Sequence, residues 1–110
     1  MARWTVEALD HRVERELNAL PSDIRARFTH VAEMLERFGP HHVGMPYVRP
    51  LGEKLWEMRL PGRDGIGRAI YSAVKGRRLV VVHAFVKKTR RTPKRPLRLA
   101  QRRAKEIRDG

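Results

Sequence analysis

The sequence predicts a mixed α/β (α+β) fold, in which an antiparallel sheet is packed by an N-terminal helical hairpin and followed by a C-terminal helix. Helical spacing of apolar residues dominates the first 38 residues, whereas short apolar segments between glycine turns fill the middle of the chain. The length of 110 residues fits a single domain, 1–110. The absence of cysteine excludes disulfides and thiolate metal sites, and it suits a reducing compartment.

The N-terminal part predicts a short strand and two helices. Trp4, Val6 and Ala8 alternate as in a strand over residues 2–8, and a helix follows from about Asp10 to Ala19. In the next segment Ser22 can cap a second helix. Its apolar stripe consists of Ile24, Phe28, Val31, Leu35 and Phe38. Gly39-Pro40 ends this helix, and the two helices are expected to form an antiparallel hairpin.

The rest of the chain predicts a loop, three strands and a last helix. The proline- and glycine-containing stretch from His41 to Pro50 reads as a connecting loop. Strands are expected at Leu55–Leu60, Ile66–Val74 and Leu79–Val86, joined by turns at 62–65 and 75–77 into an antiparallel meander. Thr92-Pro93 predicts the start of a helix that ends near Arg108. Its apolar face consists of Leu97, Ala100, Ala104 and Ile107.

Positive charge is concentrated in the second part of the chain. The net charge is +13, with −1 on residues 1–48 and +14 on residues 49–110. Ten basic residues and no acid lie between Lys87 and Lys105. Such a one-sided field suits a polyanion such as nucleic acid, although a solvated helix face or a surface for an acidic protein gives the same pattern. No segment is long and apolar enough to span a bilayer, so we expect a cytoplasmic protein without membrane contact.

The strand Leu55–Leu60 supplies the first candidate site residues. Its alternation places Trp56, Met58 and Leu60 toward the core, so Glu57 and Arg59 are expected to face outward. Arg59 and Arg68 of the next strand can bracket one phosphate if they share a face. The simpler alternative is an ordinary cross-strand ion pair of Glu57 with either arginine.

Further candidates follow the last strand, where Lys87 and Lys88 place positive charge at the end of a rigid element. Such groups stabilise the charge of a phosphorane without a metal, and we expect neither a metal nor a cofactor, since the adjacent pair His41-His42 is a poor ligand set. His83 is either a general acid or base or, more often for such a residue, part of the hydrogen-bonded packing. Tyr71 either stacks on an RNA base or sits in the core.

Four segments together resemble the phage-derived, HigB-like branch of the RelE toxin superfamily. They are YVRPLG at 47–52, LWEMR at 55–59, RAIY at 68–71 and VHAFVKKT at 82–89, followed by Thr92-Pro93-Lys94. The resemblance runs from about Tyr47 to Ile107 and implies a small RelE-like fold. It also implies a type II toxin that enters the ribosomal A site and cuts mRNA through attack of the 2′-hydroxyl, without a metal.

The resemblance also implies roles for individual residues. The catalytic, phosphate-handling set is expected to be Arg59, Arg68, Lys87 and Lys88. RNA-binding residues are expected to be Tyr71, Arg90, Arg91 and Lys94. The C-terminal helix lacks the tyrosine or histidine that relatives use in proton transfer. A lysine, His83 or Glu57 is left for that step.

The implied partners are a cognate helix-turn-helix antitoxin, the ribosome and mRNA, with operator DNA bound only through the antitoxin. Two other functions remain open at this stage. One is a ParE-like toxin that inhibits DNA gyrase without nuclease activity. The other is a basic RNA-binding protein without catalysis, which would bind RNA in a salt-sensitive way and would not arrest growth.

Overall fold

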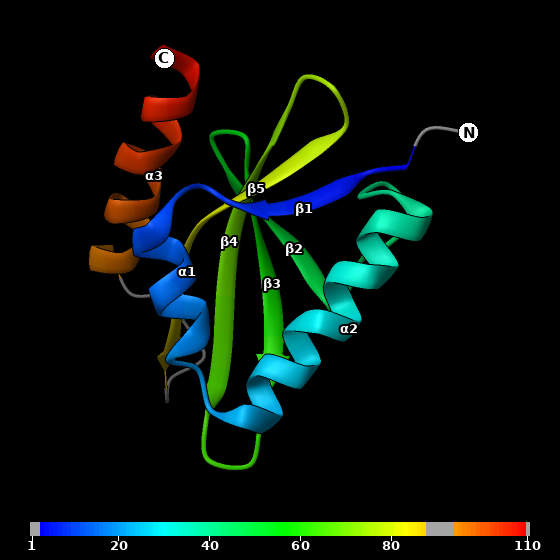
Figure 1. Cartoon of the computed structure of the whole chain (residues 1–110), viewed down its shortest axis with the longest axis vertical. Helices are drawn as coiled ribbons and strands as arrows, with labels where there is room; N and C mark the ends of the chain where they lie inside the picture. The colour runs from blue at the N-terminus through cyan, green and yellow to red at the C-terminus, as the bar shows by residue number, and fades with distance from the viewer. Residues whose placement is uncertain (1–2, 88–93, 110) are drawn as a thin grey trace.

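The computed structural model describes residues 3–87 and 94–109, which form one five-stranded sheet and three helices. The elements in chain order are β1 (Thr5–Ala8), α1 (His11–Asn18), α2 (Ser22–Phe38), β2 (Val48–Gly52), β3 (Leu55–Pro61), β4 (Ile66–Val74), β5 (Arg78–Lys87) and α3 (Lys94–Asp109). Figure 1 shows the sheet with α1 and α2 in front of it and α3 along one side. The predicted fold class is therefore confirmed.

The sheet has the strand order β1-β5-β4-β3-β2. The three predicted strands form the expected antiparallel meander, β3-β4-β5. β1 joins the other side of β5 as a parallel strand, with Thr5 opposite Arg78 and Ala8 opposite Val81. The sheet is thus mixed, because β1 pairs with β5 in parallel whereas the other three strand pairs are antiparallel.

The strand β2 begins inside the segment His41 to Pro50 that was predicted to be a loop, and that part of the prediction is wrong. Val48 pairs with Met58 and Pro50 with Trp56, at the edge of the sheet. An edge strand tolerates proline because one row of its backbone groups has no partner strand. The turn after β2 places Glu53 and Lys54 at positive φ (53° and 66°), where glycine or asparagine would have signalled a hairpin.

The helices α1 and α2 cover one face of the sheet and diverge from each other in a V, so that each packs mainly on the strands (Figure 1). Asp10 caps α1, since its Oδ1 accepts the N–H of Arg12. The N-cap of α2 is Pro21, not Ser22, and no side chain caps that end. Gly39 ends α2 at φ 83°, with its N–H donated to the carbonyl of Leu35.

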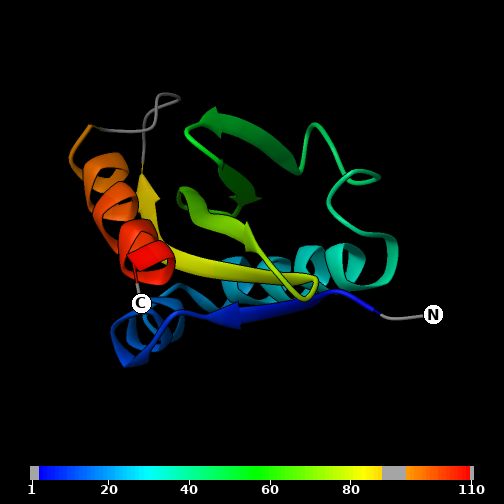
Figure 2. The ribbon, with the colours of Figure 1, turned by 90° about the horizontal axis from the view of Figure 1, so that it is seen from above.

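The helix α3 packs against the opposite face of the sheet, along β5 and the adjoining part of β4 (Figure 2). Its buried apolar residues are the small Ala100 and Ala104, which belong to a second apolar cluster that includes Ile70 and Val82. Leu97 and Ile107 flank them as predicted, whereas the predicted cap Thr92 lies outside the described residues. Because α3 stays near β5, the part of this face over β2 and β3 carries no helix. None of the three described helices is long and apolar enough to cross a membrane.

Candidate RNA-cleavage site

The side chain of Glu57 lies on the α3 face of the sheet but is fully buried, so its predicted outward exposure is wrong. Alternation along β3 correctly placed Glu57 on the other face of the strand from Met58 and Leu60, which belong to the core under α1 and α2. α3 does not extend over β3, however, and the side chains that lie against Glu57 on this face include Arg68 and Arg49. A charge buried in this way requires paired and hydrogen-bonded neighbours.

Two arginines compensate the Glu57 carboxylate. Arg68 on β4 donates from Nη1 to Oε1 of Glu57 at 2.8 Å, and Arg49 on β2 donates from Nε to the same oxygen at 2.9 Å. Arg68 is itself buried, whereas Arg49 remains partly exposed. Glu57 therefore fixes the guanidinium groups of two neighbouring strands. With its oxygen engaged by two cations, it is better suited to positioning them than to proton transfer.

Lys87 completes this group at the end of β5. Lys87 pairs with Ile66 of β4, and Phe85, two residues earlier on β5, pairs with Arg68. Residues two apart on a strand point to the same face, so Lys87 lies on the same face as Arg68. Lys87 is 6% exposed, and its Nζ has no hydrogen-bond partner among the residues that the structure describes. Burial, together with the positive charges of Arg68, Arg49 and Arg59, lowers the pKa of Lys87 to about 8, although Glu57 opposes this.

We call Arg49, Arg59, Arg68 and Lys87 the cationic cluster. Arg59 lies directly opposite Arg68 in the β3–β4 pair, and the charge of each lysine or arginine in the cluster acts on its neighbours. Burial first, and then the charges of Arg49 and Arg59, lower the pKa of Arg68, with Glu57 acting against them. Three of the four predicted catalytic residues thus converge on one face, and the fourth, Lys88, lies outside the described residues.

The cluster holds four basic groups around one carboxylate, and this imbalance has a chemical consequence. A buried ammonium without a hydrogen-bond partner is costly unless an anion approaches it. Guanidinium and ammonium groups fixed in a partly desolvated place stabilise negative charge that develops on a phosphoryl group. The arrangement therefore fits a phosphodiester, with Arg59 and Lys87 available for its oxygens and Glu57 holding Arg68 and Arg49 in place.

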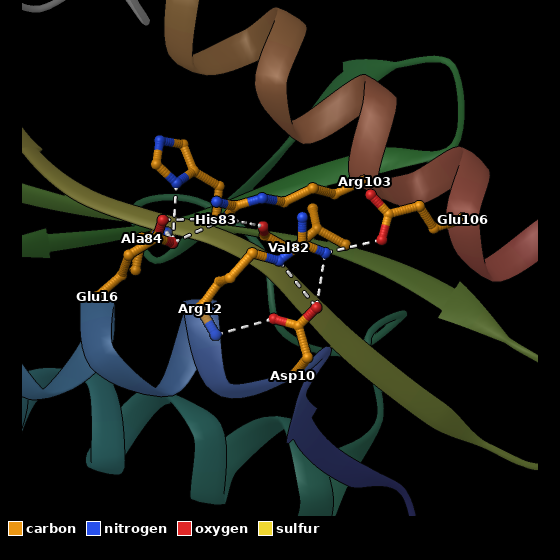
Figure 3. Close-up of polar contacts among 8 residues, drawn as sticks. All are labelled: Asp10, Arg12, Glu16, Val82, His83, Ala84, Arg103 and Glu106. Carbon is orange, nitrogen blue, oxygen red and sulfur yellow. Dashed lines mark hydrogen bonds and ion pairs between the residues drawn. The ribbon is translucent and has the colours of Figure 1, made fainter.

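His83 belongs to a different cluster, which is centred on Glu16 of α1 (Figure 3). Oε1 of Glu16 lies 2.9 Å from Nδ1 of His83 and accepts the backbone N–H of Ala84 at 3.1 Å. Nη1 of Arg103 on α3 donates to both carboxylate oxygens at 3.0 Å and to the carbonyl of Val82 at 2.9 Å. The His83 ring also stacks on Phe85, with 5.0 Å between centroids. This geometry supports the packing role that was weighed for His83 against proton transfer.

Tyr71 is fully buried in the core between the sheet and the helices α1 and α2, so the prediction that it stacks on an RNA base is wrong. It lies opposite Trp56, on the face away from the cationic cluster. Burial raises the pKa of its hydroxyl far above the ordinary value. The alternative of a core position is the correct one.

The remaining predicted RNA-binding residues lie at the start of α3 and before it. Lys94 is the first residue of α3 and is exposed to solvent. Arg90 and Arg91 lie outside the described residues. Within residues 3–87 and 94–109, no three histidine, aspartate or glutamate side chains gather as metal ligands, and His41 and His42 are exposed.

The sequence did not predict three residues that form these two clusters: Arg49 of the cationic cluster, and Glu16 and Arg103 of the cluster around His83. Arg49 was assigned to a loop, because the strand that brings it opposite Glu57 had no sequence signal. Glu16 and Arg103 are 87 residues apart and looked like ordinary charges on helix faces. Spacing within each helix, such as four residues from Arg12 to Glu16 in α1 or from Arg103 to Ile107 in α3, describes only that helix. It does not indicate that α1 and α3 meet across β5.

Comparison with known proteins gives consistent matches for the fold. A family model described as phage-derived protein Gp49-like matches residues 15–105. A mutant of the Escherichia coli toxin RelE in the free state superposes with a TM-score of 0.62 at 14% identity, covering 96% of this chain and 98% of the other. An archaeal RelE–RelB complex from Pyrococcus horikoshii gives a TM-score of 0.57 at 23% identity, covering 83% and 100%. No curated protein sequence matches the chain.

Proposed function

The chain belongs to the phage-derived Gp49-like family and has the RelE fold, and on that premise we propose that it is the toxin of a type II toxin–antitoxin system. Its activity is proposed to be cleavage of mRNA on the ribosome. The partner is proposed to be a helix-turn-helix antitoxin that neutralises the toxin and carries it to operator DNA. A cytoplasmic location follows from these partners.

The observation that carries the proposal is the cationic cluster with the buried Lys87 ammonium, which has no hydrogen-bond partner within residues 3–87 and 94–109. In the proposed reaction the 2′-hydroxyl gives its proton to solvent as its oxygen bonds to the adjacent phosphorus, and the bond from phosphorus to the 5′-oxygen breaks. Arg59 and Arg68 stabilise the charge on the non-bridging oxygens of the phosphorane. The products are a 2′,3′-cyclic phosphate and a free 5′-hydroxyl.

Lys87 is the proposed proton donor to the leaving 5′-oxygen. A general acid works best when its pKa is near the working pH, and the pKa of Lys87 is lowered to about 8. Its buried Nζ lies at the end of β5, beside the charges that would hold the phosphate. This assignment fills the role left open by the absence of tyrosine and histidine from α3.

The proposal is tested with Lys87→Met, which keeps the length of the side chain and removes its charge. Loss of a desolvated charge should leave the melting temperature unchanged or raise it, while cleavage of mRNA by the purified protein on programmed ribosomes should fall about 100-fold or more. The matched control is Lys105→Met on the exposed side of α3. Cleavage is read as new 5′ ends by primer extension.

The outcomes separate the candidate functions. Growth arrest with intact messages and inhibited DNA supercoiling would replace the nuclease with a gyrase inhibitor. If messages stay intact on ribosomes and growth is not arrested, the remaining candidate is a basic RNA-binding protein without catalysis. Full cleavage by Lys87→Met would contradict the site while leaving the nuclease activity standing.

A further inference from the structure

Two adjoining hollows lie at the end of the sheet where β1 begins, α2 ends and the β4–β5 turn projects. The larger encloses about 1070 Å³ and the smaller about 470 Å³, and Arg3, Arg37 and Phe38 line both of them. We call this pair the α2-end groove. None of the predicted site residues that the structure describes lines it.

The α2-end groove is rich in positive charge that comes from separate parts of the chain. Arg3, Arg37 and Arg77 line the larger hollow together with His41 and His42. Two carboxylates line the groove, since Glu33 borders the smaller hollow and Glu36 borders both. Oε2 of Glu36 accepts the backbone N–H of Val6 at 2.9 Å. Its charge is thus engaged by the edge of β1, and the arginines dominate the hollow.

Aromatic side chains lie among these arginines. Phe38 is 55% exposed, a high value for a large apolar ring. The Trp4 indole also lines the larger hollow and lies close against Gly39, where an added Cβ would meet Nε1 at 3.1 Å. Exposed rings beside guanidinium groups are the features that bind single-stranded nucleic acid, since rings stack on bases and arginines hold phosphates.

The groove is remote from the cationic cluster. Ile66 pairs with Lys87 at one end of β4 and Val74 pairs with Arg78 at the other, which is about 26 Å away at the rise of a strand. Arg77 directly precedes Arg78, so one phosphate cannot contact both places. The groove would contact nucleotides other than those at the cleavage site.

We propose that the α2-end groove is a second RNA-binding site, in which Phe38 stacks on a base of a single-stranded segment and Arg3, Arg37 and Arg77 hold the neighbouring phosphates. RNA is favoured over an acidic protein segment because the exposed Phe38 ring lines the same hollows as the arginines, so that a base and its flanking phosphates can be bound together. This site is independent of cleavage, and it would anchor the protein on RNA with the cationic cluster facing another segment.

Binding of a 2′-O-methyl oligouridine of twelve nucleotides, which cannot be cleaved through its 2′ position, tests the proposal with the full-length protein. Phe38→Ala should weaken binding at least about fivefold, in line with loss of one base–aromatic stack. Arg37→Gln should weaken binding and lower the slope of log affinity against log salt by about 0.7, the value for one phosphate contact on a single strand. Fluorescence anisotropy over a salt series measures both effects.

The matched control is Arg27→Gln, an exposed arginine elsewhere on α2. Photo-crosslinking of a 4-thiouridine oligonucleotide should label the peptide that contains Phe38. The proposal would be overturned if both groove variants bound the oligonucleotide as tightly as the control does. It would also be overturned if the groove variants bound RNA normally but no longer bound an acidic protein partner. Lys87→Met should retain groove binding while losing cleavage, so failure of the nuclease and failure of the groove are distinguishable.

Discussion

The buried amino group of Lys87 makes the site sensitive to protons. Lys87 is charged in the unfolded chain up to its ordinary pKa of 10.5, whereas in the folded protein its pKa is about 8. Between these values the unfolded state binds more protons, so the Lys87 contribution to stability rises with pH across this window. Below pH 8 the folded protein carries a buried ammonium, and an approaching phosphate would relieve that cost.

Lys87→Arg tests the proton-donor role separately from the charge. In the native protein kcat/KM should decline above about pH 8, as Lys87 loses its proton in the free enzyme. Arginine stays protonated, so the variant should lose this alkaline decline. It should also be slower at neutral pH by about 100-fold, the typical contribution of a general acid.

The measurement is the pH profile of single-turnover cleavage on programmed ribosomes for both proteins. A decline above pH 8 that persists in Lys87→Arg would assign the titration to another group. If Lys87→Arg is as fast as the native protein at pH 7, Lys87 contributes only its positive charge and does not donate a proton.

Single residues of the site were predictable only where strand alternation decides their position. Alternation along Leu55–Leu60 predicted the outward face for Arg59, and the pairing of Arg59 with Arg68 meets the condition that the two arginines share a face. Lys87 was expected near them only from its place at the end of a strand and from the resemblance, because that strand was predicted to end at Val86. The burial of Glu57 and Tyr71 was not predictable, because it depends on what covers each face. Alternation separates two faces of a strand but does not show that both are covered.

At the level of elements, the contact between α2 and the β3–β4 hairpin depends on glycine. Gly67 is buried, and a Cβ there would overlap the side chain of Ile24 and come within 3.3 Å of Leu60 Cβ. Gly67→Ala should therefore destabilise the protein by about 1–3 kcal/mol, the usual cost of overpacking a core.

The stability change at Gly67 is measured by urea unfolding followed by circular dichroism. Gly44→Ala is the matched control, because no atom lies within 4 Å of a Cβ built there and its φ is not positive. A Gly67→Ala protein as stable as this control would show that α2 can shift away from the hairpin without cost.

Most element types followed from the sequence, and the one missed element has a physical explanation. Apolar periodicity and glycine turns located β3, β4 and β5, and Gly39-Pro40 located the end of α2. The strand β2 was missed because Pro50 lies within it and because its turn uses Glu53 and Lys54 at positive φ. The partner strand, not the local sequence, makes this segment extended.

At the scale of the whole molecule, many acidic side chains are engaged in internal contacts. Glu7 is paired with Arg78, Glu57 with two arginines, and Asp23 accepts the backbone N–H groups of Ile24 and Arg63. Acids used in this way offer little negative charge to solvent. The surplus of +13 therefore acts outward and would attract RNA from several sides.

Glu16 joins the N-terminal and C-terminal helices through β5, so Arg103→Met should loosen the whole assembly. A hydrogen bond to a charged group contributes about 1.5–3 kcal/mol, and Arg103 donates to both oxygens of Glu16. We expect a loss of that order in the free energy of unfolding. Amide hydrogens of α3 should also exchange faster relative to those of β4.

Arg102→Met is the matched control for this experiment, because Arg102 is the exposed neighbour on α3. Hydrogen exchange measured by mass spectrometry reports each helix separately. Equal protection of α3 in the two variants would show that the apolar contacts of Ala100 and Ala104 hold the helix without the ion pair.

The parallel pairing of β1 with β5 has a consequence for synthesis of the chain. Residues 5–8 emerge from the ribosome long before residues 78–81, with which they must pair. The β3-β4-β5 meander is made of neighbouring segments and can assemble locally, whereas β1 must wait for a contact more than 70 residues away. A nascent chain of this protein therefore lacks the β1–β5 pairing until residues 78–81 have been translated and have left the ribosome, which delays the folded protein relative to its own translation.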